Sequence, residues 1–154
     1  MNSDSLFALL AAFLYNQPNM NPAKIFIAED ERFLSTILAN RLKKEGFAVS
    51  QAFDGQEAVD LLKSERPDLI IIDLILPKKS GFEVLESVSK NPDLNHVPIV
   101  VLTNLGQESD IEKAKSLGAS EYYIKVRISI DDFMNAIKSM LSRFQGSEAL
   151  QVQQ

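Results

Sequence analysis

The stretch Leu69-Ile70-Ile71-Ile72-Asp73 decides the fold. Four aliphatic residues in a row, without polar alternation, are typical of a strand that is buried on both faces of a parallel sheet. This run ends abruptly on a carboxylate, and a second run, Ile25–Ala28, ends on Glu29 and Asp30. Because the carboxyl ends of parallel strands meet at the edge where open α/β folds bind their ligands, we expect these acids to converge there.

Strand-like and helix-like patterns alternate from Lys24 onward. The expected strands are Ile25–Ala28, Phe47–Phe53 (an edge strand, since it alternates better), Leu69–Ile72, Pro98–Leu102 and Glu121–Lys125. Apolar residues at helical spacing follow each of them, and the last stripe, Ile130 to Phe144, is the richest. Five strand–helix units predict an α/β fold, a doubly wound five-stranded parallel sheet with helices on both faces.

The composition restricts the function classes. The chain has 154 residues, a length that fits one domain. Its net charge of -5 does not favour binding to nucleic acid, because the phosphate backbone is also negative. The absence of cysteine excludes disulfides, thiolate zinc sites and cysteine nucleophiles. The N-terminal apolar run, Leu6–Tyr15, is too short to span a bilayer, and no basic residue precedes Lys24 as in a signal peptide. We therefore expect a soluble, cytoplasmic protein without membrane insertion.

The acids at the strand ends suggest a magnesium site. Glu29 and Asp30 are adjacent, so their charges repel each other and favour a bound divalent cation. Mg²⁺ prefers a few carboxylates together with water and phosphate oxygens. Asp73 can accept a phosphoryl group as a nucleophilic carboxylate. The alternatives are that Asp73 simply meets water and that Asp30 caps the helix starting near Glu31.

Two further polar residues end the remaining strands. Thr103 follows the fourth strand, and its hydroxyl can donate to a phosphoryl oxygen; alone, it would be a cap or turn residue. Lys125 ends the fifth strand, and its ammonium can pair with Asp73; alone, it would be a surface lysine. Acids, a hydroxyl and an ammonium in this strand order form one constellation.

With these motifs the chain resembles a response regulator receiver domain, the CheY-like, aspartate-phosphorylated module of two-component signalling, from about Lys24 to Phe144. Lys24–Glu31 resembles the opening strand and acidic pair of the family, and Gly118–Lys125 resembles the stretch that leads to its lysine. Asp73–Pro77, with Gly81 eight residues past the aspartate, resembles the phosphoacceptor loop. The resemblance implies a flavodoxin-like strand order of 2-1-3-4-5.

The resemblance also implies a metal site and a phosphorylation site. Asp73 would be the nucleophile toward a phosphohistidine on a histidine kinase or a histidine phosphotransfer protein. Asp30, Asp73 and the backbone carbonyl of Ile75 would bind Mg²⁺, with Glu29 acting through water. Lys125 would neutralise the charge that develops on the transferred phosphoryl group.

For signalling, the resemblance implies that Thr103 and Tyr122 form a switch, the hydroxyl moving toward the phosphoryl group and the ring turning inward. This would reshape the surface of the fifth strand and of the helix that carries Ile111, Ala114 and Leu117. The protein would be a phosphoacceptor that assists its own phosphorylation and dephosphorylation rather than an enzyme. A downstream protein target would bind this surface, and the chain would be a monomer or a phosphorylation-linked homodimer.

The chain departs from the family pattern at three positions. Val126 follows Lys125 where the family usually has proline, and the lysine–proline bond is typically cis in the family. In this chain, either Lys125 sits differently or a strained cis bond persists. Asn104 replaces a small residue after Thr103 and can crowd the phosphoryl site. Glu29 replaces the commoner aspartate. Val126 and Asn104 keep one alternative open, a receiver-like interaction module that works without phosphorylation.

Two other classes of protein, an aspartate-nucleophile phosphatase and a nucleotide binder, fit this sequence less well. A phosphatase of the haloacid dehalogenase type needs an acid two residues after its nucleophile, and this chain has Ile75 there. A flavodoxin-like nucleotide binder needs a phosphate-binding loop after a strand, and Glu29-Asp30-Glu31 would repel phosphate there without a cation.

Ile75 and Leu105 flank the path of water to the phosphoryl group in the family. Because both are aliphatic and cannot orient a water molecule, we expect slow autodephosphorylation.

Three segments are expected along the chain. Residues 1–22 are an N-terminal extension, either a short helix capped by Ser3 or Ser5 or a disordered leader, with Met20 as a possible true start. Residues 23–145 are the receiver domain and residues 146–154 a disordered tail. On this view the protein is a stand-alone response regulator without an output domain.

Overall fold

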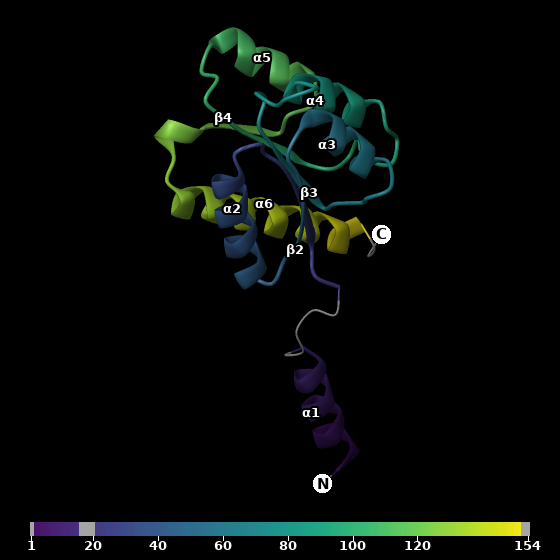
Figure 1. Ribbon diagram of the computed structural model, residues 1–154. Coiled ribbons are helices and arrows are strands. Elements are labelled where there is room, and N and C mark those ends of the chain that lie inside the picture. Colours follow the sequence, from purple (N-terminus) through teal and green to yellow (C-terminus); the bar gives the residue numbers. More distant parts are fainter. Residues whose placement is uncertain (1, 16–20, 152–154) are drawn as a thin grey trace.

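The computed structural model describes residues 2–15 and 21–151. Strands and helices alternate along the receiver-like part of the chain, after one N-terminal helix (Figure 1). In chain order the elements are α1 (Ser3–Tyr15), β1 (Lys24–Ala28), α2 (Arg32–Lys44), β2 (Ala48–Ala52), α3 (Gly55–Leu62), β3 (Leu69–Ile72), α4 (Gly81–Ser89), β4 (Ile99–Thr103), α5 (Glu108–Ser116), β5 (Glu121–Ile124), the 3₁₀ turn η1 (Lys125–Arg127) and α6 (Ile130–Gln151).

The five strands form one parallel sheet in the order β2-β1-β3-β4-β5, which confirms the predicted topology. β3 pairs with β1 on one side, with Ile70 opposite Phe26, and with β4 on the other. The backbone nitrogen of Asp73 extends the first pairing by donating to the carbonyl oxygen of Ala28 at 2.9 Å. The ends of β1 and β3 are therefore adjacent, and the acids that follow them start from neighbouring positions.

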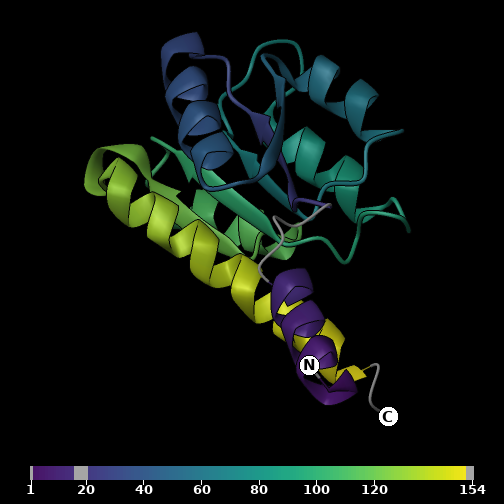
Figure 2. The ribbon, with the colours of Figure 1, turned by 90° about the horizontal axis from the view of Figure 1, so that it is seen from below.

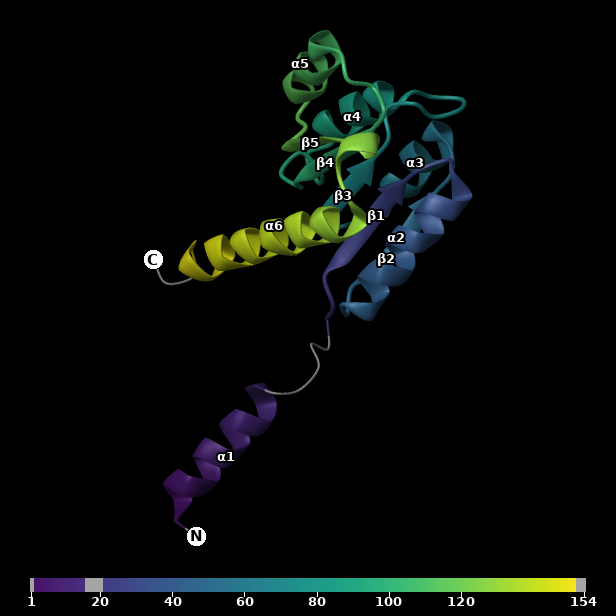
Figure 3. The ribbon, with the colours of Figure 1, turned by 90° about the vertical axis from the view of Figure 1, so that its left-hand side faces the viewer.

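Helices cover both faces of the sheet, and each face has its own apolar core. α2 and α6 lie on one face, as Figure 2 shows, while α3, α4 and α5 lie on the other (Figure 3). In β3, Ile70 and Ile72 point to the second group of helices, and Leu69 and Ile71 point to the first. Because successive strand residues face opposite sides, two covered faces require the continuous aliphatic run seen in the sequence.

β3 has the predicted bounds, whereas β1, β2, β4 and β5 each differ from the prediction by one residue at one or both ends, and two of these differences bear on the site. β4 begins at Ile99, since Pro98 has no N–H to give to the ladder and only its carbonyl is used, accepting from the backbone nitrogen of Ile70 at 3.0 Å. β5 ends at Ile124, so Lys125 opens the η1 turn instead of ending the strand. The side chain of Lys125 therefore leaves the backbone from a turn.

Both ends of the chain also differ from what was expected. α1 is capped by Asn2, whose Oδ1 accepts from the backbone nitrogen of Ser5 at 3.0 Å, and not by Ser3 or Ser5. α6 continues through Gln151, so residues 146–151 are helical where a disordered tail was predicted. A single glycine, Gly146, weakens a helix by only about 1 kcal/mol and does not end it.

Residues 152–154 and the possible start at Met20 lie outside the described residues, and the division of the chain at 22/23 and 145/146 stays a prediction. Among the described residues, no helix is both long enough and apolar enough to cross a membrane.

Candidate functional site

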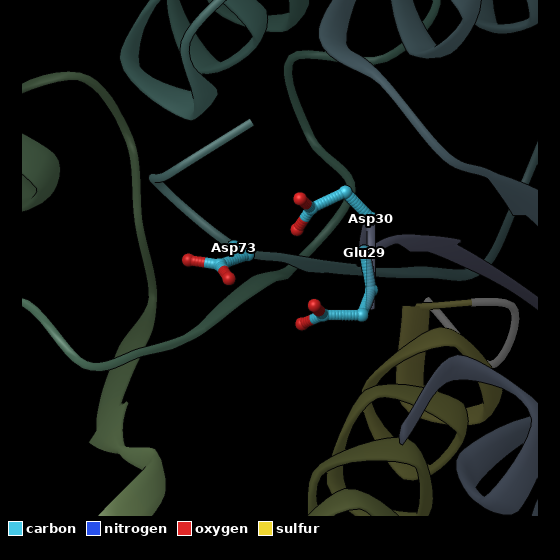
Figure 4. A group of neighbouring side chains, drawn as sticks. All are labelled: Glu29, Asp30 and Asp73. Carbon is cyan, nitrogen blue, oxygen red and sulfur yellow. The ribbon is translucent and has the colours of Figure 1, made fainter. Parts of the chain in front are cut away.

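Three carboxylates meet at the carboxyl edge of the sheet. Glu29 and Asp30 follow β1, and Asp73 follows β3; an oxygen of each lies within 4.8 Å of the others. Figure 4 shows the three side chains turned toward a common space. Glu29 and Asp73 are only 2% and 4% exposed, whereas Asp30 is exposed. The site thus joins two buried acids with one that faces water.

Lys125 is the cation that links the two buried acids. Its Nζ lies 2.7 Å from Asp73 Oδ2 and 2.8 Å from Glu29 Oε2. Burial on its own would lower the pKa of Lys125, but the hydrogen bonds to Asp73 and Glu29 outweigh it, and the pKa is raised. The lysine therefore stays charged and offsets part of the negative charge that the strand ends bring together.

The carboxylates are also held by the backbone. Glu29 Oε1 accepts from the backbone nitrogen of Glu31 at 3.0 Å, and Asp73 Oδ1 accepts from that of Ile75 at 3.0 Å. Burial raises the pKa of Glu29, against the hydrogen bond from Lys125 and together with the nearby charge of Asp73. A carboxylate that resists ionisation gains from a second positive charge, and a set of oxygen donors of this kind fits Mg²⁺.

Two helix N-termini fix the loop that follows Asp73. Gly81 begins α4, and its nitrogen donates to the carbonyl oxygen of Leu74 at 3.0 Å; a Cβ on Gly81 would lie 2.2 Å from the carbonyl oxygen of Asp73. Gly55 begins α3, and its nitrogen donates to the carbonyl oxygen of Pro77 at 3.0 Å. A Cβ on Gly55 would lie 1.8 Å from the carbonyl oxygen of Lys79. Only glycine permits these two close approaches.

The contribution of α3 was missed at the level of sequence. Asp54-Gly55 signals a turn, and the sequence does not show which loop the turn contacts. In the structure, Asp54 caps α3 by accepting from the backbone nitrogen of Glu57 at 2.8 Å and also pairs with Lys78 at 3.1 Å. Lys78 has a φ of 67°, a left-handed conformation that is uncommon for a residue with a side chain. Asp54 and Gly55 thus support the loop from outside the site.

Thr103 and its neighbour lie in different environments. Thr103 is fully buried at the end of β4, and its Oγ1 accepts from the backbone nitrogen of Leu105 at 3.4 Å. Asn104 is exposed. The hydroxyl therefore lies on the same sheet edge as Asp73, two strand ends being adjacent in the order β3-β4.

Tyr122 connects β5 to the loop after β4. Its hydroxyl donates to the carbonyl oxygen of Leu105 at 2.6 Å, and its ring packs against the core on the α3–α5 face. Burial raises the pKa of Tyr122, and the charges of Asp110 and Asp73 add to this effect. The phenol thus remains a protonated donor at neutral pH.

The bond between Lys125 and Val126 is trans, because the described residues contain no cis peptide bond. The strained cis bond, one of the two alternatives for this departure from the family pattern, is therefore absent. From the η1 turn its ammonium still reaches Asp73.

The family profile "Response regulator receiver domain" matches residues 25–138. Two curated relatives are each 38% identical: the transcriptional regulatory protein PdtaR of Mycobacterium tuberculosis, over 84% of this chain, and the phosphate regulon transcriptional regulatory protein PhoB of Rhizobium meliloti, over 78%. The matched regions cover 62% and 52% of those two proteins, so the chain spans about half to two thirds of their length.

Solved structures agree with the fold. A CheY-like response regulator receiver domain protein from Methanospirillum hungatei superposes with a TM-score of 0.76 at 22% identity, covering 82% of this chain and 98% of that one. The signal receiver domain of a signal transduction histidine kinase from Syntrophus aciditrophicus gives 0.70 at 29% identity, covering 78% and 90%.

The chain therefore belongs to the response regulator receiver domain family. Its fold is the CheY-like arrangement of a five-stranded parallel sheet, and its class of function is that of a response regulator receiver in two-component signalling. Receiver domains bind Mg²⁺ at an acidic cluster, and a histidine kinase is their general partner. The grouping of Glu29, Asp30 and Asp73 has the composition that such a site requires.

Proposed function

We propose that this protein accepts a phosphoryl group on Asp73, in the presence of Mg²⁺, from a histidine kinase or a histidine phosphotransfer protein. The observation that supports this most directly is the contact of 2.7 Å between Lys125 Nζ and Asp73 Oδ2, beside two further carboxylates. A buried lysine and a metal-binding set of acids around one aspartate are the parts that a phosphoryl transfer needs.

The chain's own residues have distinct tasks in this transfer. A carboxylate oxygen of Asp73 attacks the phosphorus, and the phosphohistidine nitrogen leaves. Lys125 balances the charge that builds up on the phosphoryl oxygens. Asp30, Asp73 and the Ile75 carbonyl would hold Mg²⁺, with Glu29 acting through water, and the bound ion would supply further positive charge to the same oxygens.

The signal then leaves through the surface of α5 and β5. The hydroxyl of Thr103 donates a hydrogen bond to the new phosphoryl group. This displaces the loop after β4, and the side chain of Tyr122 adjusts to the new position of the loop. α5 buries only Ala114 among its residues, so it can move at little cost in packing. A downstream protein partner reads this surface. We place the protein in the cytoplasm as a response regulator that signals by protein contact, without nucleic acid and without catalysing a reaction on a separate substrate.

Phosphorylation can be tested with a small-molecule donor. The full chain is incubated with acetyl phosphate and MgCl₂, and its intact mass is measured. We expect one added phosphoryl group, no addition in Asp73→Asn, and no addition when EDTA removes the metal. Binding of BeF₃⁻ with Mg²⁺ should change the NMR signals around Asp73. A wild-type chain that takes up neither reagent would instead support the phosphorylation-independent interaction module.

A further inference from the structure

The helix α1 is apolar on all sides and none of its residues is buried. Its sequence, Ser-Asp-Ser-Leu-Phe-Ala-Leu-Leu-Ala-Ala-Phe-Leu-Tyr, has a single charge, at Asp4. Seven large side chains are more than half exposed: Leu6 61%, Phe7 76%, Leu9 59%, Leu10 53%, Phe13 61%, Leu14 62% and Tyr15 89%. A helix that is hydrophobic all round is ordinarily buried, so this one lacks the neighbour that its sequence calls for.

The receiver fold does not supply that neighbour. Both apolar cores are complete without α1, since neither includes any of its residues. Figures 1 and 3 show α1 standing away from the sheet and its covering helices.

A lipid bilayer does not fit α1 either. Thirteen residues give a helix of about 20 Å, against a hydrocarbon core of about 30 Å. Helices that lie on a membrane surface use Lys and Arg on a polar face to contact anionic lipids. α1 has no polar face along its length, and Lys24 is the first basic residue of the sequence.

A second α1 fits better in spacing and in area. Two apolar seams run along the helix at positions i, i+3, i+4 and i+7, and they are Leu6, Leu9, Leu10 and Phe13, and Phe7, Leu10, Ala11 and Leu14. Three of the exposed side chains are aromatic, and each such ring buries roughly 150–250 Å² when covered. Phe13 lies on the first seam and Phe7 on the second, so an assembly that covers both seams and their four leucines approaches the roughly 800 Å² per partner that specific interfaces bury.

We propose that α1 is an oligomerisation helix that packs against the α1 of a second copy of this chain, with the two seams allowing a pair or a larger bundle. The association does not depend on phosphorylation, because α1 contributes nothing to the site around Asp73. Receiver domains are thereby held together before any signal arrives, at the high effective concentration that tethering creates.

The oligomeric state of the full chain tests this. Sedimentation velocity without acetyl phosphate should give at least twice the 17.2 kDa of one chain. The double variant Leu9→Asp, Phe13→Asp should sediment as a single chain. Phe33→Asp is the matched control, because Phe33 is 73% exposed on α2, and this variant should remain associated. Asp73→Asn should also remain associated, which separates this proposal from that of phosphorylation.

A cross-link gives a second, independent readout. Because the chain has no cysteine, Leu10→Cys carries the only thiol, and mild oxidation should convert it to a disulfide-linked dimer. Thr36→Cys, an exposed position on α2, should stay largely unlinked. A wild-type chain that sediments at 17.2 kDa at every concentration would overturn the proposal. So would a chain that remains a single copy but floats with phosphatidylcholine–phosphatidylserine vesicles, which would assign α1 to lipid.

Discussion

Lys125 is the residue on which the charge balance of the site depends. Its ammonium forms ion pairs with two carboxylates, those of Glu29 and Asp73, which are themselves almost fully buried. Lys125→Ala leaves both acids without their cation, and breaking a buried pair in this way costs about 3–5 kcal/mol. We therefore expect a fall of about 3 kcal/mol in the free energy of unfolding, measured by urea denaturation in metal-free buffer.

The control for this variant is an exposed lysine with an acidic partner. Lys138 lies 3.4 Å from Glu45, and both side chains are 40% or more exposed. Because exposed pairs contribute at most about 1 kcal/mol, Lys138→Ala should change the stability little. Equal losses in the two variants would contradict the role given to Lys125.

Ile75 sets the lifetime of the phosphorylated form in our interpretation. Its side chain is 53% exposed beside Asp73 and has no group that can orient a water molecule. Ile75→Asn adds such a group; one hydrogen bond of about 1–1.5 kcal/mol to the attacking water would speed hydrolysis about tenfold. The rate is measured as loss of phosphoryl mass after removal of the donor.

Phe144→Asn is the matched change at a distance, since Phe144 is also exposed but lies on α6, and its hydrolysis rate should equal that of the wild type. If the wild-type phosphoryl group is lost within seconds in Mg²⁺ buffer, the expected slow autodephosphorylation is wrong.

At the scale of elements, the start of α4 is packed against the backbone of Asp73. Gly81→Ala would place a methyl group 2.2 Å from the carbonyl oxygen of Asp73 and 2.5 Å from the Cα of Leu74, both backbone atoms that cannot rotate away. We expect destabilisation of about 3 kcal/mol and a slower phosphorylation by acetyl phosphate. In Gly106→Ala the new methyl meets only the end of the Ile124 side chain at 3.3 Å, so the loss should be much smaller.

The attachment of α5 gives a second prediction at this scale. Tyr122→Phe removes the hydrogen bond to the Leu105 carbonyl, which contributes about 1 kcal/mol. The loop before α5 then opens more often, and amide hydrogen exchange in α5 should become roughly fivefold faster. The amides of α2, on the opposite face, serve as the internal control. Unchanged exchange in α5 would show that the phenol does not anchor it.

Most elements could be predicted from the sequence because their periodicity is strong. Leu69–Ile72 matches β3 as expected, and the apolar stripes matched α2 to α6. The errors lie at the ends: Lys125 looks like a strand residue by its neighbours, and only the three-dimensional turn removes it from the ladder. Likewise, nothing in the residues after Phe144 stops a helix, although their polar composition suggests a tail.

The site was predictable only to the level of which residues meet. The parallel topology brings Glu29, Asp30 and Asp73 together, and the sequence alone reveals that much. The pairing of Lys125 with Asp73 was also predicted, whereas its second contact, with Glu29, was not, since that contact depends on side-chain reach from a turn. The support from Gly55 was also missed, because its contacts join segments that are more than twenty residues apart in the sequence.

At the scale of the whole molecule, metal binding and folding should be linked. An ion that binds only the folded state stabilises it, by about 1.4 kcal/mol when the free ion is tenfold above its dissociation constant. We expect added MgCl₂ to raise the thermal midpoint of the wild type and to have little effect on Asp30→Asn. NaCl at matched ionic strength controls for screening. An equal rise in Asp30→Asn would place the ion elsewhere.

The glycine contacts hold the loop after Asp73 on the side of α3 and α4. α3 and α4 contact this loop closely at Gly55 and Gly81, so the chain after Asp73 has no room to move toward these two helices. Under the proposed function, we expect a displacement at the Asp73 carboxylate to be relieved across the sheet, toward β4, β5 and α5, which buries only Ala114. The lack of a side chain at Gly55 and Gly81 would then determine the direction in which the signal is transmitted.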